Sequence, residues 1–176
     1  MKKCIDIALN CGFTSAGELD CSTIEVRTEV RDMCATNTCQ QYNKNWACPP
    51  ACGSLEECES KIKNYKKGII VQTTTELEDS MNFEGIQELG EKHSENLKKT
   101  IEELSKMYPN MLTLGTGFCN ICSKCTYPDE SCRFPEKRIS SMEAFGIVVN
   151  DVCKANNLPY NYGKNTMTYI GCFLLE

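Results

Sequence analysis

The sequence has only one histidine, His93, in 176 residues. A Ser-His-Asp or Cys-His catalytic site would have to use it, and nothing in the neighbouring sequence supplies that pattern. We therefore expect no hydrolytic catalysis of that kind. His93 lies on the apolar stripe of a predicted helix, where a histidine is typically a core residue, with a ligand or a proton donor as the alternative.

The chain also lacks an apolar run of membrane-spanning length, and no small-residue cleavage site follows its basic start, Met1-Lys2-Lys3. Its formal charge of −5 lacks the basic excess that binding to phosphate backbones requires. These absences predict a cytoplasmic protein with neither a membrane nor a nucleic-acid partner. With 41% hydrophobic residues, the chain can bury a normal core, so we expect a single domain over residues 1–176.

Cysteine is the residue type that the sequence has in excess, with 14 in the chain. So many cysteines would suit a disulfide scaffold in a secreted protein, but the signs of secretion are missing. In a reducing cytoplasm they indicate metal binding instead. The setting that this predicts is an oxygen-avoiding cell, that is, an anaerobe.

The clearest metal-binding pattern lies in Gly115–Arg138, GTGFCNICSKCTYPDESCRFPEKR. Two-residue intervals separate Cys119, Cys122 and Cys125, and Cys132 follows seven positions later. Each interval returns the next sulfur to the same side of the loop, and bacterial ferredoxins use this spacing for a 4Fe-4S cluster. Structural zinc normally takes two separate C-x-x-C pairs, so zinc is the weaker alternative, ahead of disulfides or free thiols.

Another set of cysteines, which comes first in the chain, has looser spacing. Pro49-Pro50 forbids helix and fixes an extended turn between two of them. Ser54 and Glu57 form a capping box, so a helix is expected to begin there and to run to Tyr65. This set predicts another metal site, whose fourth ligand is either Cys52 or Cys58. Its members are Cys34, Cys39, Cys48, Cys52 and Cys58. Trp46 lies among them and either shields a cluster from water or belongs to the core.

Hydrophobic periodicity predicts a single α/β domain. Helices alternate with strands, which favours a mixed, mostly parallel sheet of about four strands with flanking helices and both cysteine-rich metal loops at one end of the sheet. The expected helices are 4–11, 54–65, 83–104 and 141–156, and the expected strands are 24–31, 69–75, 111–116 and 168–175. Cys4, Cys11 and Cys172 are interpreted as small buried hydrophobes.

Four segments together carry a resemblance: RDMCATNTCQQYNKNWACPPACGSLEEC, GFCNICSKCTYPDESCRFPEKR, SMEAFGIVV and TYIGCFLL. They resemble a family described as predicted metal-binding proteins, found chiefly in anaerobic bacteria and methanogenic archaea. The resemblance spans nearly the whole chain. It implies metal binding by the cysteines that match the family pattern, which are Cys34, Cys39, Cys48, Cys119, Cys122, Cys125 and Cys132, and it leaves the metal open.

The function expected from these patterns is an iron–sulfur protein with two 4Fe-4S clusters, acting in electron transfer or as a reductase component beside a redox partner protein. Positive charge beside the nearby cluster comes from Arg133, Lys137 and Arg138. These residues would raise the reduction potential of the cluster or dock an acidic partner; the alternative is that they simply belong to a solvated loop. One alternative is an enzyme with an open iron on a three-cysteine cluster. The other is a zinc-stabilised interaction module.

Overall fold

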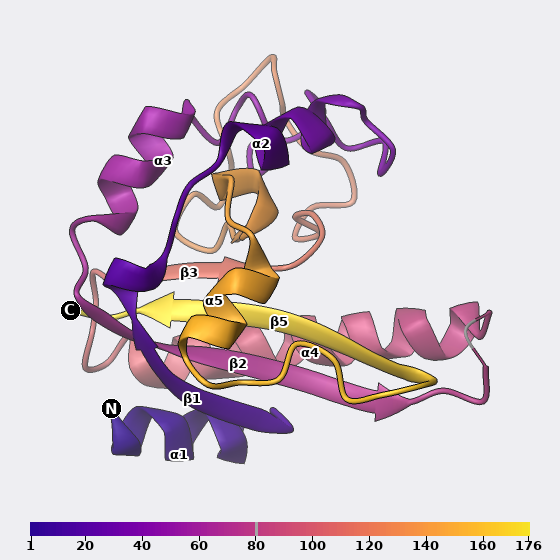
Figure 1. Ribbon diagram of the computed structural model, residues 1–176. Coiled ribbons are helices and arrows are strands. Elements are labelled where there is room, and N and C mark those ends of the chain that lie inside the picture. Colours follow the sequence, from indigo (N-terminus) through magenta and orange to yellow (C-terminus); the bar gives the residue numbers. More distant parts are fainter. Residues whose placement is uncertain (80) are drawn as a thin grey trace.

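A five-stranded sheet organises the part of the chain that this computed structural model describes, residues 1–79 and 81–176. Its spatial order is β1-β2-β5-β3-β4 (Figure 1). All neighbouring strands pair antiparallel except β3 and β4, which are parallel. The strands are β1 (Ser15–Asp20), β2 (Lys67–Glu76), β3 (Leu112–Gly115), β4 (Ser140–Ser141) and β5 (Thr166–Leu174).

Helices cover both faces of this sheet. The helices α1 and α4 pack on one face through Ala8, Leu97 and Leu104, while α3 and α5 pack on the other through Ile62 and Val152. In Figure 1, α4 runs behind the sheet and α5 lies in front of it. The bounds are α1 (Lys2–Asn10), α2 (Thr28–Ala35), α3 (Leu55–Ile62), α4 (Phe83–Leu104) and α5 (Val149–Ala155), with short 3-10 turns η1 (Cys21–Thr23) and η2 (Glu143–Phe145).

The predicted single α/β architecture is confirmed, but the prediction of about four mostly parallel strands is wrong. The two strands joined by α4, β2 and β3, do run in the same direction, because both are antiparallel to β5. The last strand inserts between them, so Cys172 pairs with Ile70 on one side and Leu114 on the other. Sequence order does not reveal this insertion, since it depends on where the chain returns to the sheet.

Two elements differ from the predicted ones. The alternating segment 24–31 forms only a bridge from Val26 to Ile147 before α2 begins at Thr28. The predicted helix 141–156 is divided into η2 and α5 by Gly146, whose φ is +78°. A β-carbon at Gly146 would lie 2.6 Å from Leu55 Cδ2, so packing of α3 excludes a side chain there. Both differences arise from contacts between distant segments, which override local periodicity.

Most other predicted elements are confirmed, with shifts of a few residues at their ends. The capping box of Ser54 and Glu57 begins α3, and the predicted final strand is central in the sheet. The strand β1 was not predicted, because its sequence, SAGELD, has little strand propensity. No helix in the described ranges is long and apolar enough to cross a membrane.

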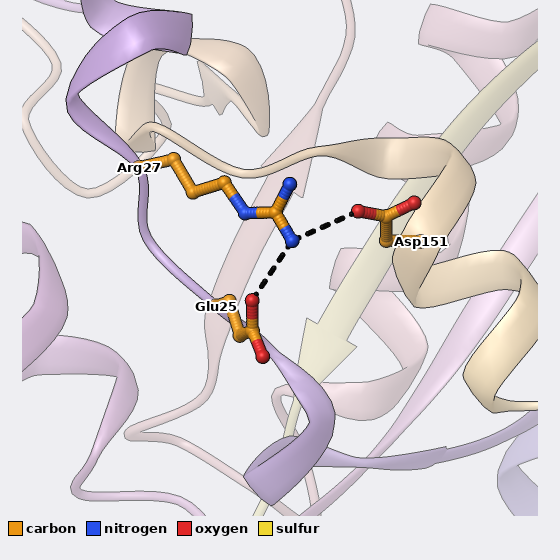
Figure 2. A network of polar contacts seen from close by, with 3 residues as sticks. All are labelled: Glu25, Arg27 and Asp151. Carbon is orange, nitrogen blue, oxygen red and sulfur yellow. Dashed lines mark hydrogen bonds and ion pairs between the residues drawn. The ribbon is translucent and has the colours of Figure 1, made fainter.

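The segment that leads into the cysteine-rich region is tied to α5. Figure 2 shows Arg27 Nη2 between Glu25 Oε2, at 2.9 Å, and Asp151 Oδ2, at 3.1 Å. The backbone N–H of Arg27 also donates to Gly146 O at 2.8 Å. All three side chains are at least 45% exposed, so the ion pairs contribute little stability, and the contacts chiefly fix where α2 begins.

Candidate metal centre

The loop after β3 gathers the second cysteine set around one pocket. Cys119, Cys122, Cys125 and Cys132 all line it, and Trp46, from the other cysteine-rich loop, completes the wall. Burial raises the pKa of Cys119, a hydrogen bond from the Ile121 backbone lowers it, and the charges of the other three cysteines raise it again. The structure therefore brings together the four cysteines that the sequence placed in this site.

Hydrogen bonds within the loop hold this set in place. Thr126 Oγ1 donates to Ser131 O at 2.9 Å, and Arg133 Nη1 donates to Lys124 O at 3.0 Å. The loop leaves β3 through Gly117, whose φ of +71° suits glycine. The chain between Cys125 and Cys132 forms neither a helix nor a strand. These two bonds across the segment hold Cys132 near the first three cysteines.

The first cysteine set is drawn from a helix end and two turns. Cys34 lies in the last turn of α2, Cys39 follows in a turn, and Cys48 and Cys52 flank Pro49-Pro50. Two of these thiols lie against the backbone of η2: Cys34 Sγ is 3.9 Å from Glu143 O, and Cys52 Sγ donates to Ala144 O at 3.6 Å. The 3-10 turn η2, which replaces the first part of the predicted helix, thus packs against two cysteines of this set.

The electrostatic environment shows that these four cysteines are neighbours. Burial raises the pKa of Cys34, and the charges of Glu143, Cys39 and Cys52 raise it further, whereas Arg31 lowers it. Burial raises the pKa of Cys48 to about 11. A hydrogen bond with Asn45 lowers this pKa, and the charges of the other three cysteines of the set raise it further. Neighbouring cysteines thus oppose the ionisation of Cys34 and of Cys48, and a cation bound among them would remove that penalty.

Cys58 lies behind this set, on α3, and is fully buried. Arg31 donates from Nη2 to Cys58 Sγ at 3.4 Å and from both Nη atoms to Gly53 O. The interaction with the Cys58 thiol lowers the pKa of Cys52 to about 7; the charge of Arg31 lowers it too, and burial opposes both. The same interaction and burial raise the pKa of Cys58. Cys58 Sγ donates to the backbone oxygen of Cys52 at 4.0 Å, and of the two thiols Cys52 has the lower pKa.

The two cysteine loops dock against each other, side by side at the top of Figure 1. The rings of Trp46 and Tyr127 meet edge to face with centroids 4.9 Å apart, and Trp46 Nε1 donates to Glu130 O at 3.1 Å. Tyr127 Oη donates to Asn43 Oδ1. Trp46 thus has a defined place between the two sets, where it covers the pocket of the second one.

Sequence reasoning missed Glu143 as a residue of the site. Its backbone carbonyl contacts Cys34, and burial raises the pKa of its carboxyl group. No spacing rule links Glu143 to a cysteine 109 residues earlier. The signal is purely tertiary, because η2 meets α2 and the segment before it only through contacts between distant parts of the chain, among them the hydrogen bond from Arg27 N–H to Gly146 O.

The remaining cysteines lie outside both sets. Cys4 and Cys172 are buried in the two apolar clusters, as expected, whereas Cys11 is only half-buried. Cys21 and Cys153 are core residues beside Cys172. All fourteen cysteines are among the described residues and are free thiols. His93 is also buried, at 1% exposure. Among the described residues, its hydrogen bond is with Thr73 and not with a cysteine of either set.

The donor chemistry of the two sets fits a thiophilic metal centre. No three cysteine, histidine or carboxylate side chains of the described residues are arranged to hold a single metal ion. Around a mononuclear zinc all four sulfurs must lie about 2.3 Å from one point. Thiolates bind both zinc and the irons of a cluster, so the cysteine sets are consistent with either.

Comparison with known proteins agrees with this donor set. The family model described as "Predicted metal-binding protein (DUF2284)" matches residues 17–175. The eight cysteines of the two sets, and Cys58, lie within the matched range, whereas Cys4 and Cys11 lie before it. No curated protein and no solved structure matches the chain significantly. Because the match covers nearly the whole chain, the protein belongs to this family of predicted metal-binding proteins.

Proposed function

We propose that the protein is an iron–sulfur protein with two 4Fe-4S clusters that acts in electron transfer or as a reductase component. One observation carries the proposal: two separate sets of four cysteines lie on loops that dock directly against each other. Thiolates are the preferred protein ligands of such clusters. Cys119, Cys122, Cys125 and Cys132 hold one, and Cys34, Cys39, Cys48 and Cys52 hold the other.

The contact between the loops supports electron transfer, because it holds the two sites adjacent to each other. The half-buried rings of Trp46 and Tyr127 form this contact. The fourteen free thiols suit a reducing compartment such as the cytoplasm. A cluster with only half-buried ligands can exchange electrons with a partner protein at the surface.

Basic residues beside the second set support an acidic redox partner. Arg133 and Arg138 line the pocket of that set, and Lys137 Nζ lies 5.8 Å from the centre of the Phe134 ring. Arg133 and Lys137 are exposed, whereas Arg138 is half-buried. Exposed positive charges around a redox centre steer an acidic surface towards it.

Metal analysis tests the proposal directly. Protein purified without oxygen is expected to contain about eight iron and about eight acid-labile sulfide per chain, because each set supplies four thiolates to one cubane. It should be brown and absorb in the visible range. Colourless protein with stoichiometric zinc and no iron would overturn the proposal in favour of a zinc-stabilised interaction module.

Separate substitution of Cys52 and Cys58 decides whether the first set has an open iron. Cys52→Ser is expected to lose the first cluster, because this thiol lies with Cys34 and Cys48 and ionises most readily. Cys58→Ser is expected to keep about eight iron per chain, since serine can still donate a hydrogen bond to Cys52. Iron content and visible absorbance provide the measurement.

The same experiment tests the enzymatic alternative. If Cys52→Ser and Cys58→Ser both retained all iron, the first cluster would have only three cysteine ligands. Its fourth iron would then be open to a substrate, as a Lewis acid requires. If Cys58→Ser alone lost the cluster, our assignment of the fourth ligand would be wrong.

A further inference from the structure

A small pocket beside the second cysteine set, with Cys119 in its lining, lies between α4 and the segment that leaves β3. Its cavity volume is about 50 Å³, enough for a ligand of a few heavy atoms. The lining residues that matter here are His93, Ser94 and Lys98 of α4, Thr116 and Cys119 after β3, and Lys137. Leu97 and Ile139 add apolar walls. The pocket therefore combines an apolar interior with a few polar groups, as ligand sites do.

His93 contributes an unpaired hydrogen-bond donor to this pocket. Its Nδ1 is 2.9 Å from Thr73 Oγ1, and that hydroxyl has no other partner in the described residues. The hydroxyl therefore donates to Nδ1, which assigns the ring hydrogen to Nε2. His93 Nε2 is buried and has no partner. An unpaired buried donor costs about 1–3 kcal/mol, a cost that a ligand acceptor would remove.

The surroundings of the ring keep it neutral and fix its orientation. Burial lowers the pKa of His93 to about 4, so at pH 7 it donates one hydrogen as a neutral group. Phe13 meets the ring edge to face, with centroids 5.5 Å apart, and the Tyr169 ring lies at 6.0 Å. With Nδ1 bonded to Thr73, Nε2 is the ring nitrogen left without a partner. Because Nε2 is not exposed, a ligand that enters the pocket reaches it only after a small shift of the lining residues.

The charges that line the pocket are all positive. Lys98 and Lys137 are exposed at its rim, and neither forms an ion pair with another described residue. No aspartate or glutamate lines the pocket. One neutral donor inside, two cations at the mouth and apolar walls suit a small planar monoanion better than a tetrahedral dianion, which would need more donors.

We propose that this pocket binds a small carboxylate, one oxygen of which accepts a hydrogen bond from His93 Nε2 while Lys98 and Lys137 balance its charge. Cys119 lines the same pocket, so the ligand lies directly beside the second cysteine set. The site uses no metal ligand to hold the anion, and it does not rest on the identity of the metal.

The single histidine makes the test specific, because the protein has only one imidazole Cε1–H signal in its NMR spectrum. Acetate is titrated into anaerobically isolated protein at constant ionic strength, with chloride as the replaced anion. The His93 signal is expected to shift along a saturable curve. Lys98→Gln and Lys137→Gln should each weaken acetate binding about threefold to tenfold, because each removes one charge near the anion. Lys92→Gln, on the same helix but outside the lining, is the matched control and should leave the affinity unchanged.

Acetamide separates charge recognition from shape, because it matches acetate in size but is neutral. We expect it to bind at least about tenfold more weakly. Inorganic phosphate, titrated in the same way, reports whether the site prefers a tetrahedral anion. The proposal is overturned if acetate causes no saturable shift, if Lys92→Gln weakens binding as much as Lys98→Gln, or if acetamide or phosphate binds as tightly as acetate.

Discussion

Replacing Cys122 with serine is expected to remove about half of the protein's iron and sulfide and a matching share of its visible absorbance. Cys122 is the middle thiol of the C-x-x-C-x-x-C run and lines the pocket of the second set. A hydroxyl is a poor substitute for a thiolate at iron. The other set has its own four cysteines, so its cluster should remain. Iron and sulfide analysis of protein prepared without oxygen measures the loss.

Cys172→Ala is the control for this loss. Cys172 is fully buried in the sheet between Ile70 and Leu114, away from both sets. Its truncation removes one buried sulfur and should lower stability by about 1 kcal/mol without loss of iron. If Cys172→Ala lost iron while Cys122→Ser kept it, the assignment of ligands to the loop after β3 would be wrong.

Brief exposure to air is expected to damage the first cluster before the second. Cys39 is exposed, whereas each cysteine of the second set is half-buried around a pocket that Trp46 covers. Oxidants reach an iron most easily where its ligand is exposed, and loss of that iron converts a 4Fe-4S centre to a 3Fe-4S one. Electron paramagnetic resonance after a short exposure should therefore show a 3Fe-4S signal from the first set.

The Cys122→Ser protein identifies the source of that signal. Because it lacks the second cluster, a 3Fe-4S signal that persists in it must come from Cys34, Cys39, Cys48 and Cys52. Disappearance of the signal in this variant would assign the labile iron to the second set. Chemistry at an open iron would then have to be sought beside Cys119, next to the His93 pocket.

The assignment of Cys52 rather than Cys58 to the first set illustrates the limit of spacing arguments. Both cysteines lie within ten residues of Cys48, so spacing left them equivalent. The structure separates them, because α3 buries Cys58 against Arg31 while the turn after Pro49-Pro50 presents Cys52 to Cys34 and Cys48. The difference depends on a guanidinium 27 residues before Cys58, which no local pattern indicates.

The sequence by itself determined the elements whose causes are local. The capping box that begins α3, the apolar stripe of α4, the apolar final strand and the second cysteine set all follow from residues close together in the chain. Helix caps, helical periodicity and C-x-x-C spacing act over a few residues, so they can be read directly.

Only the tertiary structure decided how these parts meet. The insertion of β5 between β2 and β3, the contact of Glu143 with Cys34, and the contact of Trp46 with Tyr127 all join segments far apart in the chain. The His93 pocket likewise joins α4 to the loop after β3. Such contacts form because burying distant apolar and aromatic groups together outweighs local preference, and their partners are fixed only when the whole core packs.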